Sequence, residues 1–174
     1  MKSGQSIFLV GPMGVGKTTI GRQLAKLLNY DFVDSDHEIE AKSGASIPWI
    51  FDVEGEQGFR QREQSMIDSL SQRPNIVLAT GGGAVVREDN RHALQKRGIV
   101  VYLKADVEEL IRRTAHDKNR PLLQTDDPKA TLSALIAERE PWYLEIADIV
   151  FDTHRKYSGS TANILLKQIN KLDR

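Results

Sequence analysis

One segment constrains the fold of this chain more than any other: Gly11-Pro12-Met13-Gly14-Val15-Gly16-Lys17-Thr18, which matches the pattern G-x-x-x-x-G-K-[ST]. It directly follows the apolar run Ile7–Val10 and leads into 17–29, where apolar residues recur at helical spacing. A glycine-rich turn between strand and helix converges backbone N–H groups on phosphate oxygens, and the helix N-terminus adds positive charge. The segment therefore predicts a nucleotide phosphate site. A plain turn with a solvated Lys17 is the disfavoured alternative.

Short apolar runs alternate with helical patterns along the rest of the chain, which indicates a parallel sheet covered by helices. The expected strands are residues 7–10, 31–33, 76–79, 99–103 and 148–151. Their continuous β-branched runs predict burial on both faces. With 174 residues, of which 40% are hydrophobic, we expect one α/β domain spanning 1–174.

Composition restricts the partners. The 24 basic residues balance 24 acidic ones, so nothing favours a nucleic acid or a membrane surface. The chain has no cysteine for a disulfide or a thiolate metal site, and its apolar runs are far shorter than the roughly 20 residues of a membrane helix. The apolar run before Gly11 has only four residues, too few for a signal-peptide core. We expect a cytoplasmic protein, and a monomer.

Within the phosphate loop, Lys17 is expected to reach the β- and γ-phosphates, and the hydroxyl of Thr18 is expected to ligate Mg²⁺. The loop alone does not separate a GTPase switch from an ATPase motor or a kinase. The chain lacks the Asn-Lys-x-Asp tetrapeptide of guanine-specific switches, and it is short for a motor. The strand 76–79 is followed by Thr80 and Gly81 where many related proteins have a metal-supporting aspartate, so that carboxylate must come from elsewhere. The expected nucleotide-binding residues here are Gly14, Val15, Gly16, Lys17, Thr18 and Thr19.

Two carboxylates follow the second strand in the run Asp34-Ser35-Asp36. The carboxyl ends of strands are where ligands bind in a parallel sheet. Asp34 would support magnesium through a water molecule, and Asp36 would accept a hydrogen bond from a substrate hydroxyl. Aspartates also cap helices, so the alternative is that Asp36 caps a helix over 37–42.

Taken together, six segments occur in the order and spacing of shikimate kinases, which the chain resembles over essentially its whole length. Besides the phosphate loop they are Asp34-Ser35-Asp36, Gly58-Phe59-Arg60, Thr80-Gly81-Gly82-Gly83, Asn119-Arg120-Pro121-Leu122-Leu123 and Glu138-Arg139-Glu140-Pro141. The resemblance implies a P-loop NTPase fold of the nucleoside-monophosphate-kinase-like type with strand order 2-3-1-4-5. It further implies Mg²⁺, with ATP and shikimate as the substrates, and phosphoryl transfer to the 3-hydroxyl of shikimate.

By the same resemblance, the acceptor-binding region is about 34–62, and Asp36, Arg60, Gly82 and Arg139 line the shikimate pocket. Guanidinium forks suit the shikimate carboxylate, which they can bind in a bidentate manner. Surface ion pairs, for example of Arg60 with Glu63, are the alternative. The three glycines from Gly81 onward would let the substrate ring approach the backbone, because they have no Cβ atoms. The alternative is that they form only a flexible loop after the strand.

The polar segment 115–128 is predicted to be a mobile surface loop. The resemblance makes it a lid that closes over ATP and carries Arg120 onto the phosphates, so the expected catalytic residues are Lys17, Asp36 and Arg120. Arg155 is expected near the adenine, unless it belongs to a basic surface turn.

Two alternative functions remain open. One is a gluconate or nucleoside monophosphate kinase of the same fold, and the other is a nucleotide-binding module without catalysis.

Overall fold

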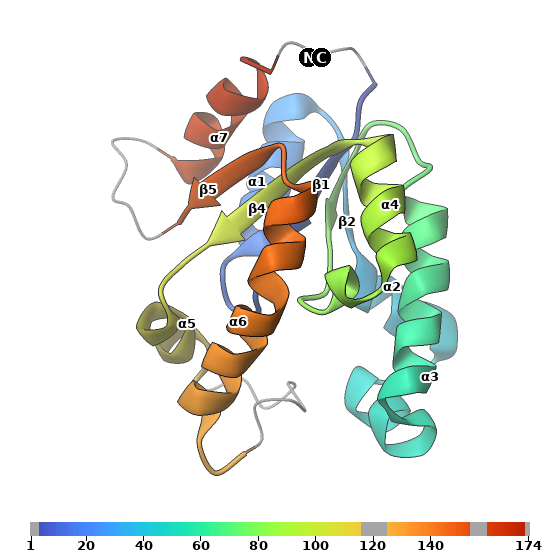
Figure 1. The fold of residues 1–174 in the computed structure, drawn as a ribbon. Helices are drawn as coiled ribbons and strands as arrows, with labels where there is room; N and C mark the ends of the chain where they lie inside the picture. Colours follow the sequence, from blue (N-terminus) through green and yellow to red (C-terminus); the bar gives the residue numbers. More distant parts are fainter. Residues whose placement is uncertain (1–3, 116–124, 154–159, 173–174) are drawn as a thin grey trace.

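The computed structural model describes residues 4–115, 125–153 and 160–172, which form one sheet with helices on both faces (Figure 1). Neighbouring strands pair in parallel, and their spatial order is β2-β3-β1-β4-β5. The predicted five-stranded parallel sheet and its order are therefore confirmed. The strands are β1 (Ile7–Val10), β2 (Asp31–Asp34), β3 (Ile76–Ala79), β4 (Ile99–Lys104) and β5 (Ile149–Asp152).

The helices follow the strands along the chain as the crossover connections of a parallel sheet require. Those described are α1 (Lys17–Leu28), α2 (Ser35–Ser43), α3 (Ile47–Leu70), the 3-10 helix η1 (Ala84–Val86), α4 (Glu88–Arg97), α5 (Val107–Thr114), α6 (Pro128–Ile146) and α7 (Thr161–Ile169). The long helix α3 is interrupted at Gly55, whose φ is 71°. None of these helices is long and apolar enough to cross a membrane.

Alternate residues of each central strand point to opposite faces of the sheet. Phe8 and Val10 of β1 pack with α2, α3, α4 and α6, whereas Ile7 and Leu9 pack with α1, α5 and α7. Figure 1 shows α4 and α6 in front of the sheet and α1 behind it. The two layers of helices bury the central strands except for Lys104 at the end of β4, and leave the loops at the strand ends accessible.

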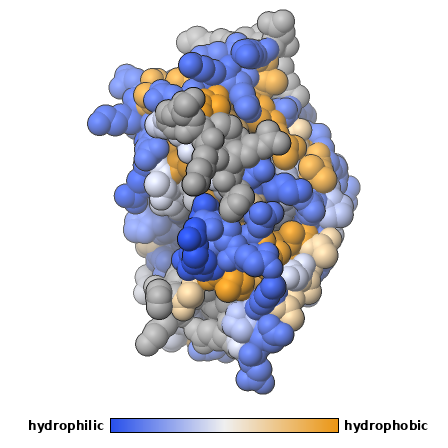
Figure 2. Space-filling model, turned by 90° about the vertical axis from the view of Figure 1, so that its left-hand side faces the viewer, coloured by the Kyte–Doolittle hydropathy of each residue, from blue (hydrophilic) through white to orange (hydrophobic). Residues whose placement is uncertain are grey.

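Burial on both faces was predicted for every strand, and this is wrong for the two edge strands. Val150 of β5 is 51% exposed, and Asp31 of β2 is exposed. In β5 the alternate residues Ile149 and Phe151 are buried while Val150 faces outward, and in β2 only Val33 is buried. The side of the molecule that carries β5, α5 and α7 is mostly hydrophilic, with small hydrophobic areas separated by polar ones (Figure 2).

Parallel pairing brings the carboxyl ends of β1, β2 and β3 to one edge of the sheet. Asp34 stands opposite Ala79 in the ladder, and Leu9 stands opposite the same residue on the other side. The backbone N–H of Thr80 and its hydroxyl both donate to the Leu9 carbonyl, at 3.1 and 2.9 Å. The phosphate loop, the Asp34 segment and the glycines after Thr80 therefore emerge side by side.

Candidate active site

The phosphate loop has the conformation that its sequence predicts. Gly14 and Gly16 adopt φ values of 78° and 104°, which are strained for residues with a Cβ atom, and α1 begins directly after them. Nζ of Lys17 donates to the carbonyl oxygens of Gly11 and Pro12 at 2.7 and 2.8 Å. The ammonium group is therefore held over the loop, beside the N-terminus of α1.

Asp34 links the second strand to the phosphate loop. Its Oδ2 accepts a hydrogen bond of 3.0 Å from the Thr18 hydroxyl. Its Oδ1 accepts from the backbone N–H groups of Asp36 and His37, at 3.0 and 3.3 Å, so Asp34 is the N-cap of α2. The alternative that Asp36 caps a helix over 37–42 is wrong, because β2 runs through Asp34 and α2 starts at once with Ser35. Asp36 stands in the first turn of α2 instead.

A cleft of about 430 Å³ joins these groups at the carboxyl edge of the sheet. Its lining includes every predicted nucleotide-binding residue of the loop except Val15, which is buried beneath it, together with the predicted metal and acceptor groups Asp34, Asp36, Gly81 and Gly82. The remaining lining residues are Met13, His37, Glu40, Thr80 and Arg113. Arg113 also donates to the Val15 carbonyl at 3.2 Å and pairs with Glu109 at 2.7 Å. The cleft is therefore bounded by both cationic and anionic side chains.

The glycines after β3 have charged side chains packed directly against them. A Cβ atom on Gly81 would lie 2.7 Å from Oδ1 of Asp36 and 2.9 Å from Oε2 of Glu63. A Cβ atom on Gly83 would overlap the guanidinium group of Arg60. Real Cβ atoms do not approach other atoms so closely, so glycine at these two positions is what lets the three side chains converge.

Arg60 lies in a buried ion pair rather than on the surface. Its side chain is 7% exposed, and Nη1 donates to Oε1 of Glu63, which is 1% exposed, at 2.8 Å. Nη2 pairs with the more exposed Glu56 at 3.3 Å. Burial acts to lower the pKa of Arg60, but attraction to Glu63 and Glu56 outweighs it and the pKa is raised. Arg60 therefore stays charged despite its burial.

Glu63 supports this arrangement from the same helix. Burial raises the pKa of its carboxyl group, against the opposing attraction of Arg60 and Arg139. Oε2 of Glu63 is buried and accepts no hydrogen bond within the described part of the chain. A buried acceptor of this kind is costly unless a ligand satisfies it, so the free oxygen, aimed at Gly81 and Asp36, marks the wall of a binding pocket.

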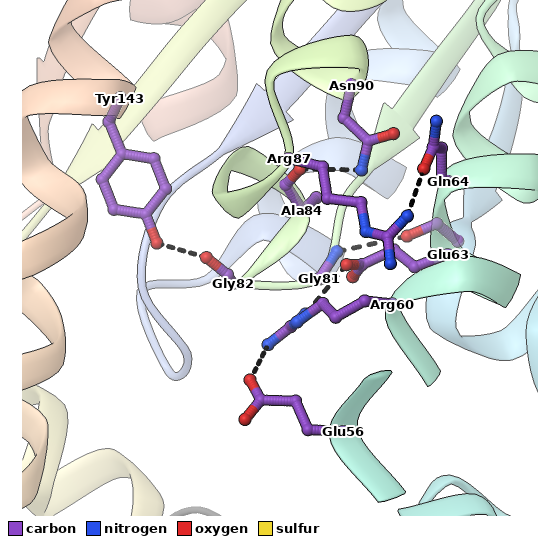
Figure 3. A network of polar contacts seen from close by, with 11 residues as sticks. Glu56, Arg60, Glu63, Gln64, Gly81, Gly82, Ala84, Arg87, Asn90 and Tyr143 are labelled. Atoms are coloured by element: carbon purple, nitrogen blue, oxygen red, sulfur yellow. Dashed lines mark hydrogen bonds and ion pairs between the residues drawn. The ribbon is translucent and has the colours of Figure 1, made fainter. Parts of the chain in front are cut away.

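Arg139 of α6 lies near the second of the glycines after β3, Gly82. It is 5% exposed, and its Nη1 lies 3.8 Å from where a Cβ atom of Gly82 would be. It forms no ion pair with any described residue; Glu140 instead pairs with Lys104 at 2.9 Å. One turn later on α6, the hydroxyl of Tyr143 donates to the Gly82 carbonyl (Figure 3).

Glu63 and Tyr143 lie at the candidate site but were not predicted from the sequence to belong to it. The available signal was spacing: Glu63 is three residues after Arg60, and Tyr143 is four after Arg139, so each shares a helix face with a predicted arginine. That spacing is equally typical of exposed pairs, and only the packing distinguishes the two cases.

Two predicted residues, Arg120 and Arg155, lie outside the described residues, as does most of the predicted lid. The predicted lid of 115–128 falls between α5, which ends at Thr114, and α6, which begins at Pro128, and it stays a prediction. All the other predicted site residues come together at one edge of the sheet: those for the nucleotide on α1 and the loop before it, Asp34 at the end of β2, and those for the acceptor on α2, α3, α6 and the loop after β3.

Comparison with known proteins agrees with this geometry. A family model described as shikimate kinase matches residues 13–170. A shikimate kinase of Psychromonas ingrahamii is 56% identical over 169 residues, covering 97% of this chain and 96% of that protein. The structure "Shikimate kinase from Acinetobacter baumannii in complex with shikimate" has a TM-score of 0.89 at 49% identity, covering 97% of this chain and 96% of that one.

A more distant structural similarity concerns the alternative that the chain is a gluconate kinase. A gluconokinase from Sinorhizobium meliloti 1021 has a TM-score of 0.52 at 16% identity, covering 90% of this chain and 86% of that one. At such an identity only the fold is shared. The family model and the relatives that cover nearly the full length decide the assignment: this chain belongs to the shikimate kinase family.

Proposed function

We propose that this protein transfers the γ-phosphoryl group of MgATP to the 3-hydroxyl of shikimate, giving shikimate 3-phosphate and ADP. This reaction is a step of chorismate and aromatic amino-acid biosynthesis. The observation that carries the proposal is the convergence of two buried arginines, Arg60 and Arg139, on the glycines beside Asp36 and the phosphate loop. Buried cations that meet next to a carboxylate suit a small molecule with one carboxylate and several hydroxyls.

On the donor side, backbone N–H groups from Gly14 to Thr19 would bind the phosphates of ATP, and Lys17 would offset their charge. The hydroxyl of Thr18 and the carboxylate of Asp34, which are in contact in the structure, are the hard oxygen ligands that Mg²⁺ prefers. When bound there, the metal would supply charge neutralisation at the β- and γ-phosphates. Arg120, on the proposed lid, would add further positive charge on closure.

On the acceptor side, Arg60 and Arg139 would bind the shikimate carboxylate, while Gly81 and Gly82 would allow its ring to lie against the backbone. Asp36 would orient the 3-hydroxyl. In the transfer, the hydroxyl oxygen forms a bond to the γ-phosphorus, the bond from that phosphorus to the β–γ bridging oxygen breaks, and Asp36 takes the hydroxyl proton. Most of the acceleration would come from positioning and electrostatics.

The rival acceptors differ from shikimate in ways that a direct assay resolves. ADP release by the purified protein with MgATP should depend on shikimate, and gluconate or nucleoside monophosphates should not replace it. Phosphorus NMR of the product should show one new phosphate monoester. If gluconate but not shikimate supports ADP release, the proposal is overturned in favour of another kinase. If none of the acceptors supports ADP release, it is overturned in favour of an inactive nucleotide-binding module.

We further propose that the protein is a cytoplasmic monomer. Size-exclusion chromatography tests its oligomeric state.

Substitution of Asp34 by asparagine tests the magnesium site. Asparagine caps helices about as well as aspartate, so α2 should keep its N-cap and the melting temperature should hold. Loss of the charge should raise the magnesium concentration for half-maximal turnover by roughly 10- to 100-fold, as for groups that hold a metal through water. Asp31→Asn, at the far end of the same strand, is the control. Equal magnesium requirements in the two variants would contradict the assignment.

Substitution of Arg60 by lysine tests the carboxylate fork. Lysine keeps the charge and loses the planar pair of donors, so the KM for shikimate should rise by about 10- to 100-fold with little change in the KM for MgATP. Arg62→Lys is the matched control, because Arg62 forms a similar fork with Glu54 on the exposed side of the same helix. If both variants bind shikimate as the wild type does, Arg60 does not face the acceptor.

A further inference from the structure

The loop of residues 81–86 has few side chains of its own to hold it, and side chains of other elements fix its backbone instead (Figure 3). The Gly81 N–H donates to the hydroxyl of Ser35 on α2 at 3.1 Å. Asn90 of α4 donates to the Ala84 carbonyl at 2.9 Å. Between them, the Gly82 carbonyl accepts from Tyr143 of α6. Glycine has little intrinsic preference for one backbone orientation, so these bonds determine how the loop presents its peptide groups.

The ring of Tyr143 is buried in the core, and its hydroxyl contacts the loop of residues 81–86. The residue is 1% exposed, and its ring stacks on that of Tyr102 with centroids 4.9 Å apart. Burial raises the pKa of the Tyr143 hydroxyl to about 12, with Arg139 opposing the rise. The hydroxyl therefore remains protonated, and a donor, across the range in which the enzyme works.

The bond to Gly82 has a consequence on the opposite side of the peptide. No peptide bond of the described chain is cis, so the Gly82 carbonyl and the Gly83 N–H point in opposite directions. Tyr143 lies on one side of the loop, and Arg60 and Glu63 lie on the other (Figure 3). The Gly83 N–H therefore faces the side of Arg60, and it donates to no acceptor within the described part of the chain.

We propose that Tyr143 is a positioning residue for the acceptor: by holding the Gly82 carbonyl, its hydroxyl turns the Gly82–Gly83 peptide so that a donor faces the substrate pocket. This inference rests on the proposed function. Without the hydroxyl, the peptide is free to rotate between two glycines, and the carbonyl oxygen would lose its only described partner. Such a rotation would present an oxygen, which repels a carboxylate, where the pocket needs an N–H.

The test compares Tyr143→Phe with the wild type and with Tyr102→Phe. The two tyrosines stack on each other, but the hydroxyl of Tyr102 contacts Glu140 rather than the glycine loop, at 3.2 Å. Steady-state kinetics should show the KM for shikimate raised about three- to tenfold in Tyr143→Phe, the size expected for one lost hydrogen bond. The KM for MgATP should be unchanged, and Tyr102→Phe should match the wild type. Titration calorimetry with shikimate should show the same ranking of dissociation constants.

Each outcome bears on one of the two proposals. A wild-type protein that releases no ADP with shikimate overturns the proposed function, and the inference falls with it. An active wild type whose Tyr143→Phe variant keeps a normal KM for shikimate overturns the inference alone. A parallel rise in the KM values for shikimate and MgATP, with a lowered melting temperature, would show that Tyr143 only maintains the core, and this also overturns the inference.

Discussion

Replacement of Lys17 by methionine is expected to lower the turnover number by about 10²- to 10³-fold, the loss typical of removing one preorganised group that stabilises developing charge. Methionine keeps the length and the apolar stem of the side chain but has no charge to place on the phosphates. The variant should also lose the two hydrogen bonds from Nζ to the carbonyls of Gly11 and Pro12. Because Lys17 lies at the start of α1 and outside the core, the fold should persist.

The measurement is ADP release at saturating MgATP and shikimate, with the melting temperature recorded for the same preparation. Lys26→Met is the matched control, since Lys26 is an exposed lysine near the other end of the same helix. It should have normal turnover. Near-normal turnover of Lys17→Met would mean that the loop does not act on the transferred phosphoryl group, whatever else it binds.

Replacement of Asp36 by asparagine should have an effect of comparable size on the acceptor side. The amide can still accept a hydrogen bond from a hydroxyl, but it can take no proton and carries no charge. Loss of a positioned proton acceptor costs about 10²- to 10⁴-fold in rate. The backbone N–H of Asp36 donates to Asp34, and the substitution leaves that bond in place, so α2 should form as before.

Initial rates with saturating shikimate separate the effect on turnover from one on binding. Glu38→Gln provides the control, since Glu38 is an acidic residue in the same first turn of α2 and does not line the cleft. The assignment of the acceptor pocket would be wrong if Asp36→Asn and Glu38→Gln had the same turnover as the wild type. A raised KM with normal turnover would reduce Asp36 to a binding group.

Much of the fold could be predicted because it depends on local patterns. The strands from Ile7 and Ile76 are short, buried β-branched or aliphatic runs, and the helix from Lys17 ends within one residue of its expected limit, with Asn29 in the left-handed conformation as its C-cap. The errors occur at the edges. Val150 belongs to a run as apolar as any other, yet its exposure depends on where its strand lies in the sheet, which no short segment encodes.

The role of Asp34 illustrates the same division. From the chain alone, either aspartate of Asp34-Ser35-Asp36 can cap the following helix. If the helix starts two residues earlier or later, the two aspartates exchange the roles of cap and free carboxylate. The pairing of β2 with β3 decides between the two, because it extends the strand through Asp34. Asp34 then becomes the cap and touches Thr18, and Asp36 turns toward Gly81.

The phosphate loop is what the sequence by itself determined, because its function needs only consecutive residues: glycines with positive φ, a helix N-terminus and a lysine. The acceptor side was decided by the tertiary structure. Arg60 and Glu63 on α3, Gly82 after β3, and Tyr143 on α6 come from three separate parts of the chain, and whether each is a surface group or part of a pocket depends on burial. Burial removes water from the Arg60–Glu63 pair, and long-range packing places the hydroxyl of Tyr143 on the Gly82 carbonyl.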